Sequence, residues 1–121
     1  PNQFLPKPSA VTINVKNGSL RIGMASITAE VMRARGFKVQ DVGNYKMQDI
    51  KEPVRVIFGD AGHDAALLVA AYIAGANLVN DGRASAIVDV VVGQDFKQVR
   101  SKALAEEEMS RPVASPSGPG C

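Results

Sequence analysis

The sequence predicts an α/β (α+β) two-layer sandwich, in which a mixed sheet carries two helices on one of its faces. Two segments, 22–35 and 60–74, repeat their apolar residues at three- and four-residue intervals, which is typical of helices. Clusters of glycine, asparagine and aspartate separate them from short alternating or apolar runs, so the expected order is β-α-β-β-α-β. The strands are expected at 11–15, 37–42, 54–58 and 87–92, with a short extended piece at 78–79.

The first predicted helix has a clear signal at its C-terminal end. Gly36 occupies the position of a C-cap glycine, and Arg33 and Arg35 in the last turn complement the helix dipole. The apolar stripe expected to face the sheet consists of Met24, Ile27, Val31 and Ala34.

The second predicted helix begins at Asp60, whose carboxylate is expected to act as the N-cap, and ends before Gly75. Beyond it, residues 80–82 (NDG) are a strong turn signal. In the last strand, alternation turns Asp89 away from the helices, where it is exposed or paired. The apolar face of the helix is expected to consist of Ala66, Leu68, Val69, Tyr72 and Ile73.

The chain divides into three parts by composition. Residues 1–10 contain three prolines and are predicted to form an extended linker, and residues 11–96 are predicted to be the folded domain. Residues 97–121 are predicted to be partly helical and then disordered, since the end of the chain is rich in Ser, Pro and Gly and closes on Cys121. The longest apolar run, 65–76, is too short to span a membrane.

Composition excludes several classes of chemistry. The chain has one Cys and one His, which leaves no internal disulfide framework, no zinc site built from Cys and His, and little basis for a catalytic triad. Fourteen Lys and Arg against twelve Asp and Glu give a net charge of +2, too balanced to indicate nucleic-acid binding. The charge is uneven, however, since residues 1–59 hold nine basic against four acidic groups.

The segment 18–23 (GSLRIG) has glycines at the spacing of a phosphate-binding loop. Met24 and Ala25 follow it in place of the Lys and Ser/Thr that such a loop requires, so nucleotide hydrolysis is rejected. Two readings stay open. Free N–H groups at the helix start, with Ser19 and Arg21 nearby, could hold an anion. Alternatively, Gly18 makes the turn, Ser19 caps the helix and Gly23 lets the helix approach the sheet.

Other candidate sites are weaker. His63 lies beside Asp60 and Asp64 in the first turn of the second helix, where capping and solvation explain the three residues better than a metal site. No pair of carboxylates has a spacing that would define a general acid and base. We therefore predict no cofactor and no metal.

Six short motifs occur in an order that resembles the LytR C-terminal domain family, over about residues 11–96. The departures from that pattern are mild: Ile57 and Phe58 stand where an aromatic residue is common, and the loop at 44–53 is longer than usual. The motifs are 15–19 (VKNGS), 23–25 (GMA), 35–39 (RGFKV), 41–44 (DVGN), 54–59 (VRVIFG) and 89–96 (DVVVGQDF).

This resemblance implies a non-catalytic module of the cell envelope, outside the cytoplasm, attached to the membrane only through an anchor upstream of residue 1. Its implied partners are peptidoglycan or another cell-wall polymer, the LytR–CpsA–Psr wall ligases, or both, and not nucleic acid; the oligomeric state is left open. The alternative is a small enzyme or anion-binding domain for phosphate-bearing wall precursors. The residues predicted to bind ligand are Asn17, Ser19, Arg21, Arg33 and Arg35.

Overall fold

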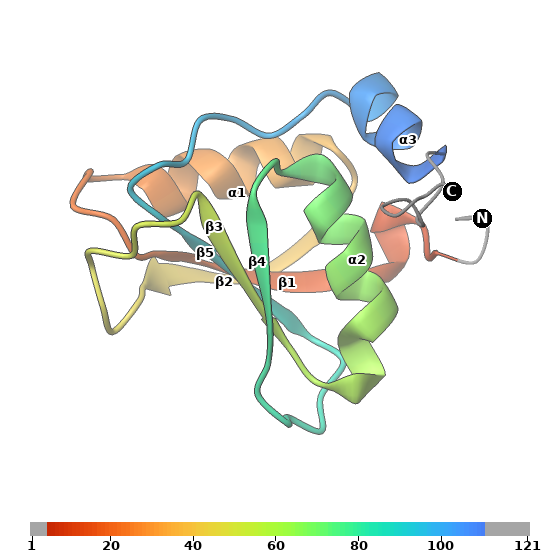
Figure 1. Cartoon of the computed structure of the whole chain (residues 1–121), viewed down its shortest axis with the longest axis horizontal. Coiled ribbons are helices and arrows are strands. Elements are labelled where there is room, and N and C mark those ends of the chain that lie inside the picture. The colour runs from red at the N-terminus through yellow and green to blue at the C-terminus, as the bar shows by residue number, and fades with distance from the viewer. Residues whose placement is uncertain (1–4, 111–121) are drawn as a thin grey trace, which may run out of the picture.

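The computed structural model describes residues 5–110 and shows one five-stranded sheet with helices packed on one side (Figure 1). Two short 3-10 helices, η1 and η2, and three α-helices accompany the strands. None of the helices in the described range is long and apolar enough to cross a membrane. The elements are η1 (Pro8–Ala10), β1 (Thr12–Asn17), α1 (Met24–Ala34), β2 (Lys38–Asn44), β3 (Val54–Phe58), η2 (Asp60–Gly62), α2 (His63–Tyr72), β4 (Ala76–Asn80), β5 (Val88–Val92) and α3 (Lys102–Ser110).

The sheet is mixed, as the sequence predicts, with the strand order β2-β1-β5-β3-β4. β1 pairs in parallel with both β2 and β5, and β3 pairs in parallel with β4. The two groups meet at an antiparallel pairing between β3 and β5. The C-terminal ends of β1, β2 and β5 therefore lie at one edge of the sheet, together with the N-terminal ends of β3 and β4.

The main core lies between the sheet and the helices α1 and α2. Alternate residues of the three central strands point into it, such as Val15 in β1, Val56 in β3 and Val90 in β5, and all three are fully buried. The predicted apolar face of α2 is correct, because all five of its residues are buried. Phe37 and Tyr72 close one end of the core with an edge-to-face ring contact.

The predicted apolar stripe of α1 is wrong by about one residue. Its buried residues are Ala25, Thr28, Ala29 and Met32, whereas Ile27 is more than half exposed. Both stripes fit the helical period, and the small side chains decide between them: two alanines let the helix approach the sheet closely. The C-terminal signal is confirmed, since Gly36 has a φ of +105° and the N–H of Phe37 bonds to the carbonyl of Met32.

Asp60 does not cap α2, which corrects another prediction. It opens η2, makes no side-chain capping bond, and accepts a hydrogen bond from Asn80 at 2.9 Å instead. The turn at 80–82 is confirmed: Gly82 has a φ of +78°, and its N–H donates to the Asn80 side chain.

A third helix, α3, packs beside α2 in the region where the sequence predicts partial helicity (Figure 1). Arg100 ties the two together: its N–H donates to the carbonyl of Tyr72 and its guanidinium to that of Ala71, at 2.7 and 2.9 Å. The predicted disordered tail from 111 and Cys121 lie outside the described residues.

Within residues 5–110 no helix packs on the opposite face of the sheet, but the loop between β2 and β3 folds over part of it. Ile50 of this loop is buried against Ile57 and Val91, with Tyr45 and Val79 packed around them. This second, smaller apolar cluster divides the open face into a covered area and a polar area.

Candidate binding surface on the open face of the sheet

Asn17 and Ser19, two of the predicted ligand-binding residues, form an internal hydrogen-bond network in the turn after β1. Both are buried. The Ser19 hydroxyl donates to Asn17 Oδ1 at 2.7 Å, and Asn17 Nδ2 donates to the carbonyl of Arg21 at 2.8 Å. The polar groups that the anion-binding hypothesis needs are thus used to shape the turn.

The two glycines of this segment have roles opposite to those predicted. Gly18 is the close-approach position, because an added Cβ would lie 2.8 Å from Val91 Cγ1 and 3.1 Å from the carbonyl oxygen of Val92. Gly23 has open space around it and is required instead for its φ of +82° at the N-cap of α1. Ser19 makes no capping bond to α1, so that prediction was also wrong.

The three predicted arginines lie at opposite ends of α1, and the five predicted residues therefore do not converge on one site. Arg21 precedes the helix, and its Nη2 donates to the carbonyl of Phe96 at 2.9 Å and to that of Gln94 at 3.3 Å. Arg35 ends the helix and donates to the carbonyl of Arg100 at 2.8 Å, while Arg33 is exposed in the last turn. An eleven-residue helix separates these ends by roughly 16 Å. Ligand binding by these residues stays a prediction.

The C-terminal ends of parallel strands are a common ligand site in α/β folds, but here the loops that follow the strands bond to one another across these ends. The N–H of Gly18 donates to Val92, that of Ile50 to Gly18, and that of Gln94 to Ile50. These bonds, at 2.7–2.9 Å, fasten the loops after β1, β2 and β5 to one another.

A polar hollow of about 460 Å³ lies on the open face, beyond the area that the loop covers. β1, β3 and β5 provide its floor, and the ends of the β2–β3 and β4–β5 connections provide its walls. Its lining residues are Lys16, Asn44, Tyr45, Lys46, Ile57, Asp81, Arg83 and Asp89.

Arg83 is held rigidly at one side of this hollow by two carboxylates. Its Nε and Nη2 donate to the two oxygens of Asp81, both at 3.0 Å, and Nη2 also donates to Asp89 Oδ2 at 3.0 Å. Asn14 donates to the other oxygen of Asp89 at 3.1 Å. Hydrogen bonds from Arg83 lower the pKa of Asp81, and the same carboxylates raise the pKa of Arg83. The expectation that Asp89 is exposed or paired is met by this pairing.

Lys16 and Lys46 bring two further positive charges to the hollow, and within residues 5–110 neither makes an ion pair. Three cations therefore face two carboxylates, and both carboxylates are engaged by Arg83. Tyr45 also belongs to the lining of the hollow. This combination suits an anionic, hydrogen-bonding ligand.

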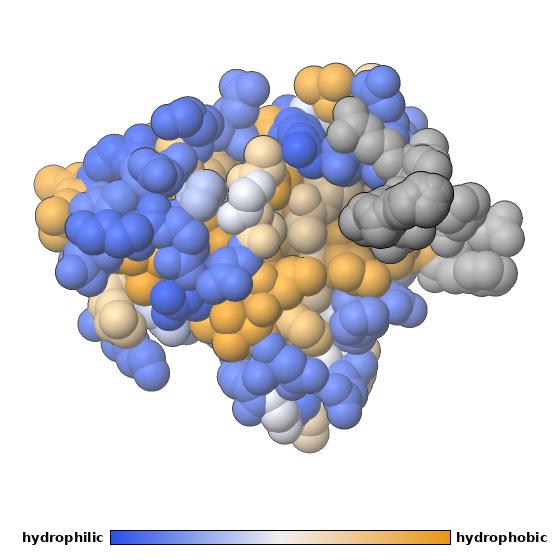
Figure 2. All heavy atoms as spheres, viewed as in Figure 1, coloured by the Kyte–Doolittle hydropathy of each residue, from blue (hydrophilic) through white to orange (hydrophobic). Residues whose placement is uncertain are grey.

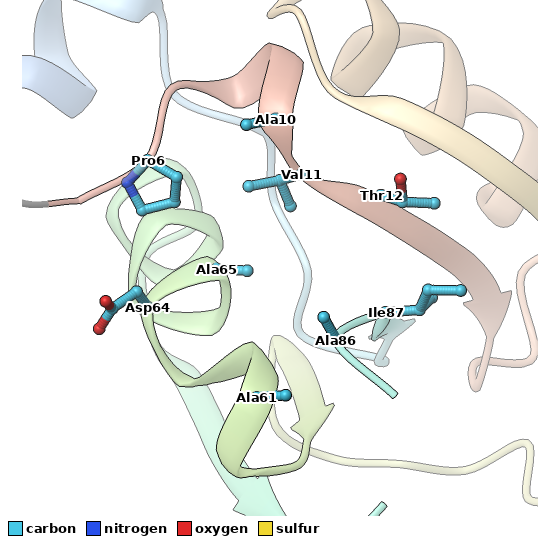
Figure 3. Close-up of a pocket in the computed structure, with 9 residues that line it drawn as sticks. All are labelled: Pro6, Ala10, Val11, Thr12, Ala61, Asp64, Ala65, Ala86 and Ile87. Carbon is cyan, nitrogen blue, oxygen red and sulfur yellow. The ribbon is translucent and has the colours of Figure 1, made fainter. Parts of the chain in front are cut away.

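A second depression, of about 340 Å³, is lined mainly by small or apolar side chains (Figure 3). Alanines from η1, η2, α2 and the segment before β5 surround it, and Asp64 is the only charged residue among the described residues that line it. His63 lies near this end of α2, where its ring contacts Phe58 and its Nδ1 lies 3.4 Å from Asp64. No group of three metal-ligating side chains occurs among the described residues.

The family model for the LytR cell envelope-related transcriptional attenuator domain, LytR_C, matches residues 10–96. The chain belongs to the LytR_C family. This membership confirms the resemblance inferred from the six motifs and makes the chain a cell-envelope-related domain.

A solved structure supports the LytR_C fold independently. The soluble domain of a conserved hypothetical secreted protein from Mycobacterium marinum, an ortholog of Rv2700, is similar with a TM-score of 0.76 and 27% sequence identity. The similarity covers 86% of this chain and 74% of that one. Among curated proteins, none matches this LytR_C chain significantly.

Sequence reasoning on this LytR_C domain missed Tyr45, Lys46, Asp81 and Arg83 as parts of the hollow. A partial signal existed, because strand alternation turns both Lys16 and Asp89 away from the helices. The sequence does not show that the turn after β4 carries Arg83 back over β5. That placement depends on β5 lying between β1 and β3.

Proposed function

We propose that this LytR_C domain is a non-catalytic binding module of the cell envelope, which holds an anionic wall polymer such as peptidoglycan against the open face of its sheet. The observation that carries the proposal is the pair of ammonium groups, Lys16 and Lys46, that line a polar hollow without an ion-pair partner in the described chain. The opposite face of the sheet is occupied by α1 and α2, so the open face is the side available to an extended ligand.

The chemistry of the hollow matches such a polymer. Peptidoglycan carries carboxylates on its peptide stems and hydroxyl and amide groups on its sugars, so it presents both anions and hydrogen-bond partners. Lys16 and Lys46 would attract the anions, and Asn44 would bond to neutral groups. Arg83 is already bonded to Asp81 and Asp89, so its role is to keep the wall of the hollow in place.

A location outside the cytoplasm is part of this proposal. Its support is the similarity to a domain of a protein described as secreted, together with the envelope-related family. Attachment through an upstream anchor, with residues 1–10 as linker, remains a prediction from the sequence.

Retention on purified peptidoglycan sacculi tests the proposal. We expect the chain to co-sediment with sacculi at low salt and to be released as salt rises. The double substitution Lys16→Glu with Lys46→Glu should weaken retention roughly tenfold, because each exposed ion pair is worth on the order of 1 kcal/mol or less. The matched control is Lys97→Glu with Lys102→Glu, which changes the net charge equally away from the hollow.

Two results would contradict the proposal. If the unmodified chain stays in the supernatant at low salt, the domain does not bind this polymer. If both double variants lose retention equally, net charge controls binding and the hollow does not.

A second role, as a scaffold for LytR–CpsA–Psr ligases, is favoured by an apolar tip at the start of α1. Leu20 and Ile22 are 70% and 97% exposed, and Ile27 adds to the same end of the molecule. Figure 2 shows hydrophobic atoms at the left edge, where the loop between β1 and α1 lies in Figure 1. Exposed apolar residues at a rigid turn are typical of protein contacts. Ile22→Ser should abolish capture of a purified ligase ectodomain while leaving retention on sacculi unchanged.

A further inference from the structure

We propose that a cavity between η1, α2 and α3 binds an amphipathic anion, a small molecule with one apolar chain that ends in a carboxylate or a phosphate. This inference goes beyond the proposed function and is independent of it. The cavity lies on the helix side of the sheet, whereas the polar hollow lies on the open face.

The cavity forms where four parts of the chain meet at one end of the molecule (Figure 1). The segment 5–9, which leads into η1, provides one side and α3 provides another. The C-terminal end of α1 and the surface of α2 complete the lining. Its volume is about 470 Å³, within the range of roughly 300–1,000 Å³ that is usual for small-molecule sites.

The apolar part of this lining suits a hydrocarbon chain. Leu68 and Tyr72 of α2 are buried residues of the main core that also border the cavity, and Met109 of α3 packs against the same core. A chain bound here would lose its apolar contact with water, which favours binding. The apolar lining residues are Leu5, Pro6, Pro8, Leu68, Tyr72 and Met109.

The hydroxyl of Tyr72 is a polar group without a partner in this lining. Tyr72 is 1% exposed, and its hydroxyl makes no hydrogen bond within residues 5–110. Among the described residues, Thr28 holds the only side-chain polar atom that is both sealed from solvent and unpartnered, so the Tyr72 oxygen reaches accessible space. The cavity is the space that Tyr72 borders. Since a buried tyrosine usually has a hydrogen-bond partner, a ligand in the cavity would supply the missing one.

The Tyr72 hydroxyl is suited to donate to an anion. Burial raises the pKa of this hydroxyl, the carboxylate of Glu106 adds to the rise, and Arg35 opposes it. The hydroxyl therefore keeps its proton at neutral pH and acts as a donor. Because Arg35 influences the hydroxyl electrostatically, an anion bonded to Tyr72 would also lie near a guanidinium.

Three cations border the cavity: Lys7, Arg35 and Lys102. Arg35 Nε donates to the carbonyl of Arg100 at 2.8 Å, which holds this side chain in place without a carboxylate. Neither lysine forms an ion pair within the described chain. Glu106 is the one acid among the described residues that border the cavity, so positive charge remains for an anionic group.

The other acids around this end of the molecule leave that balance unchanged. Glu108 of α3 lies 3.8 Å from Arg100, whose charge it offsets, and Glu107 is outside the lining. Asp64, one turn before Leu68 on α2, borders the neighbouring depression instead. Of the five residues predicted from the sequence to bind ligand, Arg35 is the one that borders this cavity.

Titration of the 121-residue chain with decanoate, below its micellar concentration, tests the inference. We expect saturable binding with a Kd of about 10–100 μM, which is ordinary for a ligand of this size. Acetate and inorganic phosphate have an anionic group without the chain, and decanol has the chain without the charge. Each of the three should bind at least roughly fivefold more weakly than decanoate, because it uses only one part of the lining.

NMR spectroscopy locates the bound decanoate without any substitution. The chain has two tyrosines, and they border different hollows: Tyr72 this cavity and Tyr45 the polar hollow. The ring signals of Tyr72 should therefore shift during the titration, and those of Tyr45 should not.

Two sets of variants, measured by calorimetry, separate the roles of the hydroxyl and the charges. Tyr72→Phe should weaken decanoate binding about three- to tenfold and leave decanol binding unchanged, since it removes only the donor. Tyr45→Phe is its control. Lys7→Glu with Lys102→Glu should weaken decanoate binding roughly tenfold. Lys51→Glu with Lys97→Glu, the same change of charge at exposed lysines outside the cavity, should not.

Several results would overturn the inference. It fails if decanoate does not bind, if decanol binds as tightly as decanoate, or if the signals of Tyr45 shift in place of those of Tyr72. It also fails if a control variant weakens binding as much as its partner does. If the Tyr72 signals shift when the chain is concentrated without any probe, a second copy fills the cavity and the inference is wrong.

Discussion

Gly59 illustrates how single residues fit this fold. It follows β3 in extended backbone, and an added Cβ would collide with the carbonyl oxygen of Arg83 and lie 2.8 Å from the Arg83 side chain. The residue therefore keeps the chain after β3 in contact with the segment that carries the arginine of the hollow. Position 59 needs glycine because there is no room for a Cβ, and not because of its backbone conformation: any residue can adopt its φ of −120°.

We expect Gly59→Ala to lower the free energy of unfolding by about 2–4 kcal/mol, because backbone would have to move to relieve the clash. Chemical denaturation followed by circular dichroism measures this. Gly43→Ala is the matched control: Gly43 lies in β2 with nothing within 4 Å of an added Cβ, so its replacement should be nearly neutral. Equal losses in the two variants would show that contact with Arg83 is not the cause.

Thr28 is the converse case, a polar group in the core without a partner. It is 1% exposed on the buried face of α1, and its hydroxyl makes no hydrogen bond within the described chain. We expect Thr28→Val to raise the free energy of unfolding by about 1 kcal/mol, since it removes an unsatisfied group while keeping the shape. Thr12→Val, on the open face of β1, should change it far less. A loss of stability in Thr28→Val would mean that the hydroxyl has a partner in solution.

At the scale of elements, the loop between β2 and β3 acts as a cover for one part of the open face. Ile50 anchors it by packing on Ile57 and Val91, and its N–H and carbonyl bond to Gly18 and Gln94. The sequence of this loop is mostly polar, so its packing against the sheet was not predicted. Ile50, the one β-branched aliphatic residue of the loop, was the available signal.

We expect Ile50→Ala to destabilise the chain by about 2–4 kcal/mol, the usual cost of removing a buried isoleucine side chain. Because the loop bonds to the carbonyl of Gly18 and accepts from Gln94, the amides at position 50 and of Gln94 should lose protection in hydrogen exchange more than those of β5. Met47→Ala, on the exposed part of the same loop, should leave both measurements unchanged. Uniform loss of protection across the sheet would instead show that the loop is not a separate unit.

α1 shows where helical periodicity reaches its limit as a predictor. Two stripes of the same period run along it, and the sequence analysis chose the one with larger apolar side chains. The fold buries Ala25 and Ala29 and exposes Ile27, since a helix that lies close to a sheet needs small residues at the contact. The face of α2 was predicted correctly because most of its large side chains, Leu68, Val69 and Tyr72, lie on the buried side.

At the scale of the whole molecule, the uneven charge along the chain does not become a separation of charge in space. β1 from the basic first half lies beside β5 from the acidic second half. Lys16 and Lys46 therefore share a hollow with Asp81 and Asp89. The surface is basic there only because Arg83 engages both carboxylates.

Two carboxylates make the stability of the whole fold depend on pH. The pKa of Glu52 is lowered mainly by a hydrogen bond from Arg55, and that of Asp81 mainly by one from Arg83. A lowered pKa in the fold means that the ionised form is favoured by folding. The stabilisation is therefore complete above the ordinary carboxyl pKa of about 4 and is lost as the pH falls through the lowered values.

We expect the thermal midpoint to fall as the pH drops from about 5 to about 2, and to fall less steeply in Glu52→Gln with Asp81→Asn. Calorimetry across this range measures the effect. Glu30→Gln, on the exposed side of α1, should keep the slope of the unmodified chain. A double variant with the same slope as the unmodified chain would show that other carboxylates dominate acid unfolding.

Short sequence patterns predicted the element order, the mixed two-layer class, the C-terminal cap of α1 and the buried face of α2. These features depend on residues that are only a few positions apart in the chain. The order of strands, the bonds between the loops that follow β1, β2 and β5, and the hollow formed by Lys16, Lys46 and Arg83 depend on packing between residues distant in sequence. Contacts between residues distant in sequence produce no periodic pattern along the chain, so only the tertiary structure reveals them.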